Sequence, residues 1–163
     1  GIKTTSVASD IVKLEYEFKQ KSFGKTNAFK PENVGYGISN VLPVVVAILK
    51  SRAGDLLIIE NPESQTHPKA QAILGRMISL LAQNNVQIII ETHSDHVING
   101  IRVGVKENND LNKRTILFYF EKIFSDSEQY SKIKNIEIDQ HGELSEYPDT
   151  LLNEWSNQLL KLL

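Results

Sequence analysis

The sequence predicts an α/β fold, a mostly parallel sheet with flanking helices. Two short apolar runs, at 56–59 and at 86–90 with Gln87 as the one polar residue, are bounded by turn residues, which is typical of buried parallel strands. Between them, apolar residues recur at spacings of three and four over 70–81, as in an amphipathic helix. A second helical pattern then leads to a third apolar run at 115–120. This strand–helix–strand–helix–strand order favours parallel strands joined by crossover helices.

The segment before these strands predicts one exposed strand, a loop and a helix. Residues 11–20 alternate between apolar and charged side chains, as in a half-exposed strand. Residues 21–36 are polar and contain glycine, so we expect a loop. Residues 41–52 are apolar almost all round and predict a buried helix with Pro43 in its first turns. Their many β-branched residues leave a strand as the alternative.

The segment after residue 105 is less regular. Residues 106–114 predict a polar loop, and a polar segment follows the 115–120 strand. Residues 133–138 alternate as a further strand, and Gly142 marks a turn. The chain closes on an amphipathic helical pattern at 149–163 that contains Trp155.

Composition indicates one globular core and excludes several classes of protein. The 163 residues are 40% hydrophobic and 23% charged, and 18 basic against 20 acidic residues give a net charge of −2, with no excess of either sign to favour nucleic acid or an anionic membrane. The absence of cysteine excludes disulfides and thiolate metal sites. The longest apolar stretch, Val41–Leu49, is far shorter than the roughly 20 residues of a membrane span, and no secretory signal pattern is present. We therefore expect no membrane partner and a cytoplasmic location.

Polar side chains follow both central strands of the predicted sheet. Glu60 and Glu63 follow the first strand, and Glu91-Thr92-His93-Ser94 follow the second. The carboxyl ends of neighbouring parallel strands open onto one crevice, where α/β sheets bind ligands. An acid at the end of a buried strand resembles the Walker B arrangement, in which the acid serves the Mg²⁺ of a bound nucleotide.

A glycine-containing segment precedes the helix predicted at 41–52. Gly35, Gly37 and Ser39 lie at alternate positions there. Glycines let a backbone approach phosphate oxygens closely, and a helix amino terminus attracts anions.

These segments, in this order, resemble the carboxy-terminal half of an ABC-type ATPase head. The resemblance covers about seventy residues from Val34 to Gly104 and is strongest to bacterial AAA proteins related to the OLD, RecF and SMC families, within a group that has an uncharacterised carboxy-terminal extension. VGYGISNVLP resembles the ABC signature and LLIIENPE resembles Walker B. SQTHP resembles the D-loop, and IIIETHS resembles the strand that carries the switch histidine.

The resemblance implies ATP and Mg²⁺ as ligands and a dimer of heads that sandwiches ATP. Glu60 would hold Mg²⁺ through water, and His93 would lie near the γ-phosphate. Gly35, Gly37 and Ser39 would belong to the signature that reaches the partner's nucleotide. Gln65 and His67 would lie along the interface between the two heads.

Two positions depart from the family pattern. The Walker B acid is Glu60 where the family has aspartate, and the position of the usual general base is Asn61. An amide can orient a water molecule but cannot accept its proton. Either Glu63 acts as the base, or hydrolysis is slow and the nucleotide mainly clamps the dimer.

No G-x-x-x-x-G-K-[ST] phosphate loop occurs in the sequence. In the resembling family this loop lies upstream, so we expect a carboxy-terminal fragment that lacks the Walker A strand. Such a fragment would bind ATP poorly and would self-associate through its exposed sheet. We divide it into an amino-terminal strand and loop (1–33), the ATPase half (34–120) and an extension (121–163).

Two other functions are open. The first alternative to an active ATPase is a catalytically dead, nucleotide-gated interaction module. The second is a metal-dependent hydrolase in which His93 and His96 bind the metal, although Ser94 interrupts the usual ligand pattern. The kinship implies DNA maintenance or defence against foreign DNA, while no residue pattern here indicates DNA binding.

Overall fold

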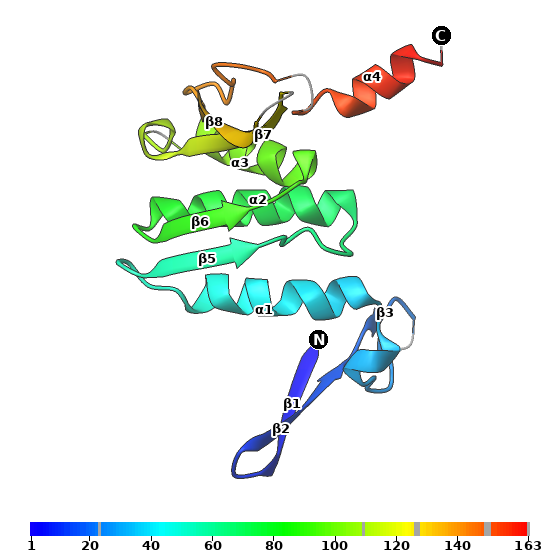
Figure 1. The fold of residues 1–163 in the computed structure, drawn as a ribbon. Helices are drawn as coiled ribbons and strands as arrows, with labels where there is room; N and C mark the ends of the chain where they lie inside the picture. The colour runs from blue at the N-terminus through cyan, green and yellow to red at the C-terminus, as the bar shows by residue number, and fades with distance from the viewer. Residues whose placement is uncertain (23, 109, 126–127, 149–150, 163) are drawn as a thin grey trace.

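The computed structural model describes residues 1–163 except 23, 109, 126–127, 149–150 and 163 (Figure 1). The elements are, in chain order, β1 (Ile2–Ala8), β2 (Ile11–Tyr16), β3 (Lys19–Gln20), β4 (Gly24–Lys25), η1 (Pro31–Asn33), α1 (Tyr36–Lys50), β5 (Leu56–Glu60), α2 (Pro68–Gln83), β6 (Gln87–Glu91), α3 (Asp95–Glu107), η2 (Asn112–Arg114), β7 (Ile116–Phe124), β8 (Gln129–Glu137) and α4 (Glu154–Leu160).

The parallel pair β5–β6 lies at the centre, joined by the crossover helix α2. Its register runs from Leu56 opposite Gln87 to Glu60 opposite Glu91. Helices α1 and α2 lie behind the pair in Figure 1 and cover one face of it, so that Ile59 is buried. The predicted strands and their connecting helix are confirmed.

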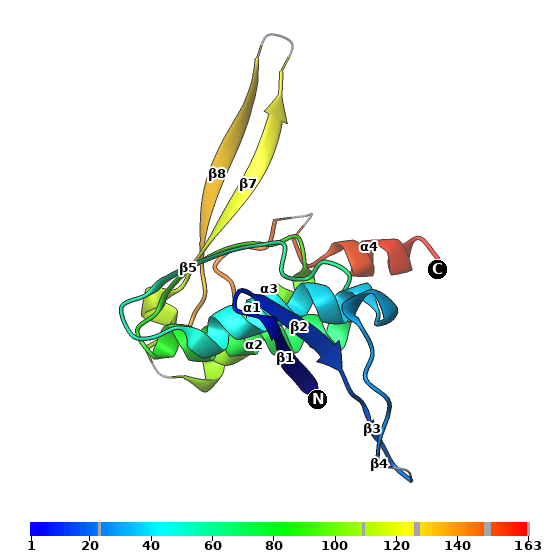
Figure 2. The same cartoon turned by 90° about the horizontal axis from the view of Figure 1, so that it is seen from below.

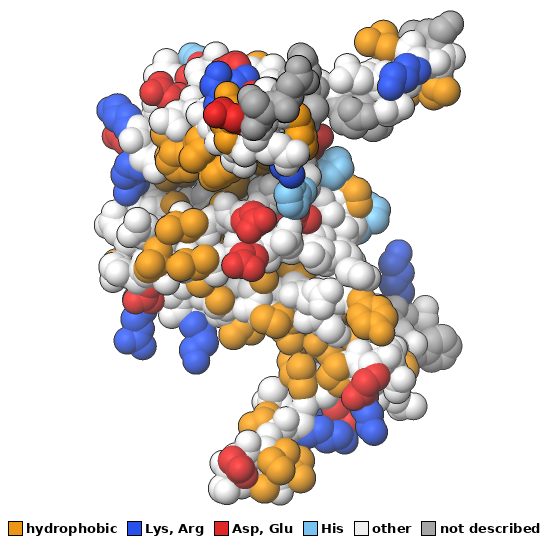
Figure 3. Space-filling view, viewed as in Figure 1, with side chains coloured by type: hydrophobic (Ala, Val, Ile, Leu, Met, Phe, Trp, Pro, Cys, Tyr) orange, Lys and Arg blue, Asp and Glu red, His pale blue; other side chains and the backbone are white. Residues whose placement is uncertain are grey.

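The prediction that both strands are buried on both faces is wrong. Leu56 and Ile58 on β5 and Ile89 on β6 are 54%, 62% and 53% exposed. They alternate with the buried side and form an apolar face, seen toward the viewer in Figure 3. An apolar run cannot distinguish a strand covered on two faces from one covered on one, because the cover is supplied by other elements.

The prediction of a mostly parallel sheet is also wrong. The described residues form four two-stranded sheets, of which only β5–β6 is parallel, so the fold is mixed α/β. Strand β7, expected as a third parallel strand, instead pairs antiparallel with β8 from Ile116 opposite Glu137 to Phe124 opposite Gln129. Two strands that lie close together in the sequence can pair antiparallel without a crossover.

The β7–β8 hairpin projects from the body on the side of the open sheet face (Figure 2). Strand β7 continues to Phe124, into the polar segment predicted after residue 120, and β8 begins at Gln129, four residues before the strand predicted at 133–138. Along β7 the exposure alternates: Ile116, Phe118 and Phe120 are exposed, whereas Leu117 and Tyr119 are partly buried against the body.

Helix α1 is confirmed over its strand alternative, but it is not a buried helix. Ile48 is its one buried residue, and Leu49 is 74% exposed. Pro43 lies inside the helix rather than in its first turns, since α1 begins at Tyr36. Proline has no N–H group, so the Ser39 carbonyl four residues earlier loses its usual helical partner.

The amino-terminal segment is an antiparallel β1–β2 hairpin followed by the small β3–β4 pair. The strand predicted at 11–20 is confirmed over Ile11–Tyr16 as β2, but residues 19–20 belong to β3 in a separate sheet. The predicted loop at 21–36 contains β4 and η1. Tyr16 is buried and pairs with Phe29 in an isolated bridge.

The last predicted helix is shorter than its pattern. It spans Glu154–Leu160 within the expected 149–163, where residues 149–150 and 163 and the side chain of Trp155 lie outside what is described. Leu159 and Leu160 are exposed. No helix among the described residues is long and apolar enough to cross a membrane.

Two separate hydrophobic cores hold the chain together. The sheet core consists of buried residues from α1, β5 and α2 and the residue before β6: Ile48, Ile59, Leu74, Ile78, Leu81 and Val86. The extension core consists of buried residues from α3 and everything after it: Ile98, Val105, Leu111, Ile136, Ile138, Leu144 and Leu151.

Helices α2 and α3 meet at a crossing lined by glycine. A Cβ at Gly75 or Gly100 would overlap backbone atoms of the opposing helix, and one at Gly104 would overlap the Ser79 side chain. The Ser79 hydroxyl donates across the crossing to the Ile101 carbonyl at 3.3 Å. Gly100 therefore permits this close packing, and α3 continues through it unbroken.

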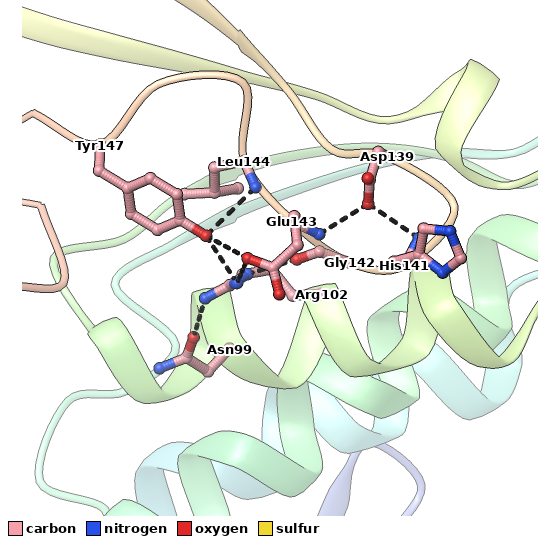
Figure 4. Close-up of polar contacts among 8 residues, drawn as sticks. All are labelled: Asn99, Arg102, Asp139, His141, Gly142, Glu143, Leu144 and Tyr147. Carbon is pink, nitrogen blue, oxygen red and sulfur yellow. Dashed lines mark hydrogen bonds and ion pairs between the residues drawn. The ribbon is translucent and has the colours of Figure 1, made fainter.

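The extension is fastened to α3 by Arg102 (Figure 4). Its guanidinium donates to the Gly142 carbonyl at 2.6 Å, to the Tyr147 hydroxyl at 3.0 Å, to Glu143 at 3.2 Å and to the Asn99 amide oxygen at 2.9 Å. The Tyr147 hydroxyl in turn donates to Glu143 at 2.6 Å. One arginine thus holds both sides of the 139–147 loop.

That loop is closed by Asp139. Its carboxylate accepts from the backbone N–H groups of Glu143 and His141, both at 2.8 Å. These bonds hold the pKa of Asp139 below its ordinary value of 3.8, and the bond from the Glu143 N–H has the largest effect. Gly142 has φ +80°, which confirms the predicted turn.

We predict that Gly100→Ala destabilises the protein by about 1–3 kcal/mol, the usual cost of overpacking, because its methyl group would overlap the Ala72 carbonyl of α2. Urea unfolding followed by circular dichroism measures this. The control, Val103→Ala, shortens an exposed side chain on the same helix and should change the free energy of unfolding little. Equal stability of Gly100→Ala and the wild type would contradict the close crossing.

We predict that the Asp139 carboxylate makes stability depend on pH in the acid range. Its folded-state pKa is depressed, so its contribution is present above the unfolded value near 4 and is lost as the pH falls through the folded value. Asp139→Asn should therefore be less stable than the wild type at pH 7, and the difference should shrink below pH ~4. Urea titrations of both proteins at several pH values measure it, with Asp10→Asn as an exposed control. A difference that does not vary with pH would refute the assignment.

Candidate functional site

The carboxyl ends of β5 and β6 form one edge that carries two acids side by side. Glu60 and Glu91 are opposite each other in the parallel register. Both are exposed, and both follow the uncovered apolar face of their strands. Figure 3 shows acidic side chains and histidines at this end of the apolar face. We assigned Glu91 no role from the sequence, and the signal that identifies it is the register, in which one strand's terminal acid lies opposite the other's.

Glu63 ties the two strand ends together. One carboxylate oxygen accepts from the Thr92 hydroxyl at 2.8 Å, and the other accepts from the His93 backbone N–H at 2.7 Å. The Thr92 hydroxyl also accepts from the Ser94 N–H at 3.1 Å. Glu63 therefore fixes the turn that presents His93, and both of its oxygens are engaged in doing so.

Asn61 continues the strand ladder into that turn. Its N–H donates to the Glu91 carbonyl at 2.9 Å, and its own carbonyl accepts from Ser64 at 3.1 Å. Its φ of 45° is left-handed, a conformation that asparagine tolerates better than most residues. The side chain is exposed at the same edge as Glu60.

A second set of hydrogen bonds supports the turn from α2. The Ser94 hydroxyl donates to the Gln71 side chain at 2.6 Å, and Gln71 donates to the Thr66 carbonyl at 2.8 Å. Ser94 also caps α3, because its side chain accepts from the backbone N–H groups of His96 and Val97. Gln71 was not identified from the sequence, because its helical position gave only the outer face of an amphipathic pattern.

The glycine-containing segment reaches the 65–67 segment of the same chain. A Cβ at Gly37 would overlap the Gln65 carbonyl, whose residue has a left-handed φ of 60°. Gly35 is the N-cap of α1, forms no side-chain cap and has open space around it. The Ser39 hydroxyl lies 3.5 Å from the Pro31 carbonyl, at the limit of a hydrogen bond.

The two candidate histidines differ in their contacts. The His93 side chain is 81% exposed, with Nε2 3.9 Å from Glu91. His67 caps α2, because its Nδ1 accepts from the Lys69 N–H at 3.2 Å. His93 is therefore free to meet a ligand at the edge, whereas His67 already has a structural role.

The donors at this edge fit a hard cation held through water. Oxygen ligands suit Mg²⁺, which retains several waters when few carboxylates are available. Glu60 and Glu91 supply such carboxylates. Among the described residues no group of three or more His, Asp or Glu side chains could hold a metal directly, so His93 and His96 have no third ligand for the alternative hydrolase site.

The structure thus brings Glu60, Asn61, Glu63 and His93 to one edge of the sheet. It connects the Gly35–Ser39 segment to that edge through Gln65. Figure 1 shows the amino terminus of α1 at the same end of the molecule as the strand ends.

Comparisons with known proteins identify two regions. Residues 3–98 match the family model of the AAA ATPase domain, and residues 112–162 match that of a family of proteins of unknown function, DUF3696. No curated protein and no solved structure matches the chain. The first match covers more than half of the sequence and includes every residue of the edge described above. The chain belongs to the AAA ATPase domain family, followed by a DUF3696 region.

Proposed function

We propose that this chain supplies one side of an ATP site, with Glu60 at the Walker B position and His93 near the γ-phosphate. The observation that carries the proposal is the Glu63 bridge, which holds His93 beside the strand ends that carry Glu60 and Glu91. Membership of the AAA ATPase family supports nucleotide binding in general. The roles of the individual residues are our inference from their positions.

Mg²⁺ fits this edge through Glu60, with Glu91 beside it. When bound, it would neutralise phosphate charge. Glu60 and Glu91 would orient its water ligands, Glu63 would keep the 92–94 turn in place, and His93 would donate a hydrogen bond to phosphate.

We propose Asn61 as the residue that orients the attacking water, and slow hydrolysis as the result. Glu63 is poorly placed as a general base, because both of its oxygens already accept hydrogen bonds. The nucleotide would then act mainly as a clamp between two heads. Gly35, Gly37, Ser39, Gln65 and His67 would lie toward the second head in that dimer.

The phosphate-binding loop would come from a segment outside these 163 residues. The sequence contains no Walker A motif. The apolar face formed by Leu56, Ile58 and Ile89 is open in this chain and would be covered in the complete site. A nucleotide-gated module that does not hydrolyse ATP is the second candidate, favoured by the amide at position 61.

We predict that Mg·ATP binds at least tenfold more weakly to this chain alone than to the protein that also carries the phosphate loop. The phosphate loop supplies most of the contacts to the β- and γ-phosphates. Isothermal titration calorimetry on both proteins measures this. Equal affinity would mean that the Gly35–Ser39 segment cradles phosphate by itself, and would contradict its assignment to the second head.

We predict that Asn61→Glu raises ATP hydrolysis at least tenfold in the protein that carries the phosphate loop, because a general base contributes about 10²–10⁴-fold. Phosphate release under saturating Mg·ATP measures the rate. Asn61→Asp is the matched variant, since aspartate tolerates the left-handed backbone better than glutamate does. If neither variant is faster than the wild type, the base lies elsewhere.

A further inference from the structure

We propose that Gln71 is a positioning residue for the site described above. Its side-chain amide joins the 63–66 segment to the 92–94 turn and thereby fixes where His93 lies at the edge of the sheet. The contacts that carry this inference all lie within this chain. Only the effect on bound nucleotide rests on the function proposed above.

The Gln71 amide donates to one segment and accepts from the other. Its nitrogen donates to the Thr66 carbonyl at 2.8 Å, and a longer contact of 3.4 Å reaches the Glu63 carbonyl. Its oxygen accepts from the Ser94 hydroxyl at 2.6 Å. Because a carbonyl can only accept, the amide nitrogen has to face Thr66, and the oxygen is left to face Ser94. Glutamine supplies a donor and an acceptor at one end of its side chain, which a carboxylate does not.

Ser94 connects this amide to the turn and to α3. The residue is buried, and its one hydroxyl proton goes to Gln71. The hydroxyl oxygen accepts from the N–H groups of His96 and Val97 at 3.1 and 3.2 Å. The hydrogen-bonding capacity of the hydroxyl is then complete. The first turn of α3 and the Gln71 amide therefore both determine where Ser94 lies.

His93 is held on both sides. On one side, Glu63 accepts from the Thr92 hydroxyl and from the His93 backbone N–H. On the other side, the next residue, Ser94, is held by Gln71. The His93 side chain itself is 81% exposed, so packing contributes little to its place. The position of this histidine at the edge therefore depends on the hydrogen bonds that hold its neighbours.

The same amide also holds the 65–67 segment, which we assign toward a second head. Thr66 lies in the middle of that segment, and its carbonyl accepts from Gln71. The Thr66 hydroxyl and N–H both donate to the Glu63 carbonyl, at 2.7 and 3.0 Å, and close a turn. Gln71 thus sets the position of the 65–67 segment relative to His93.

Helix α2 is a firm support for this amide. Gln71 lies in its first turn, and α2 packs closely against α3 at Gly75 and Gly100, where a Cβ would overlap the backbone of the opposing helix. Helices packed this tightly do not readily shift to compensate for a lost contact. An altered amide therefore acts on the two segments that it joins and leaves the packing of α2 and α3 in place.

The first test measures amide hydrogen exchange by NMR in this chain. Gln71→Glu keeps the length of the side chain and the acceptor for Ser94 but removes the donor to Thr66. We expect it to speed exchange at the His93 N–H about tenfold, the effect of one lost hydrogen bond, and to leave the buried Val105 N–H unchanged. Gln71→Ala removes both contacts and should have the larger effect at His93.

Gln83→Glu is the control, because it places the same charge at the exposed last residue of α2 and should change neither rate. An unchanged rate at His93 in both Gln71 variants would overturn the positioning role. Equal acceleration at His93 and Val105 would also overturn it, because Gln71 would then stabilise the whole fold and not position the turn.

The second test measures nucleotide affinity by calorimetry in the protein that carries the phosphate loop. We expect Gln71→Glu to weaken Mg·ATP binding about tenfold, as for one lost hydrogen bond to a charged group. Mg·ADP binding should not change, because ADP lacks the γ-phosphate that His93 would face. In a double-mutant cycle, Gln71→Glu should weaken Mg·ATP binding no further once His93→Ala is present.

Unchanged Mg·ATP affinity in Gln71→Glu, an equal loss with Mg·ADP, or a further loss of full size beside His93→Ala would overturn action through His93. If His93→Ala alone leaves Mg·ATP affinity unchanged, the function proposed above fails. The exchange rates still decide in that case whether Gln71 positions His93, since they are measured without nucleotide.

Discussion

The parallel register of β5 and β6 is the constraint on which the rest of the site depends. It aligns Glu60 with Glu91, and it brings the turn after β5 beside the turn after β6, where Glu63 reaches both Thr92 and His93. A shift of one residue would turn every side chain of a strand to the opposite face. Ile59 would then lose its place in the core, so the packing that stabilises the sheet also fixes the geometry of the edge.

The sequence was sufficient for elements whose pattern is local. The periodicity of α2 and α3 and the compact apolar runs of β5 and β6 placed these elements within a few residues. The sequence was not sufficient to predict which strands pair with each other, or which faces of a strand or helix other elements cover. Nothing in Ile116–Phe120 distinguishes a third parallel strand from one arm of a hairpin, and the apolar run of α1 gives no information on which of its faces is covered.

Residue types at the site were predictable, whereas several of their roles were not. Glu63 stood out as an acid near a strand end, but only its two hydrogen bonds reveal a positioning role. His67 was predicted to lie at the interface between two heads, and in the structure its side chain caps α2. Gln71 carries no signal in a single sequence, and Glu91 stands out there only as one of the polar residues after the second strand, because the partners that give both residues their roles lie about twenty to thirty positions away.

The magnitudes explain why the Glu63 bridge orients a turn and does not hold the fold together. Hydrogen bonds to a charged group contribute about 1.5–3 kcal/mol each, and less where water competes, as at this half-buried carboxylate. The sheet core contains six buried apolar side chains, each worth about 1.5–3 kcal/mol. The core therefore supplies most of the stabilisation of the sheet, whereas the bridge fixes how His93 is presented at its edge.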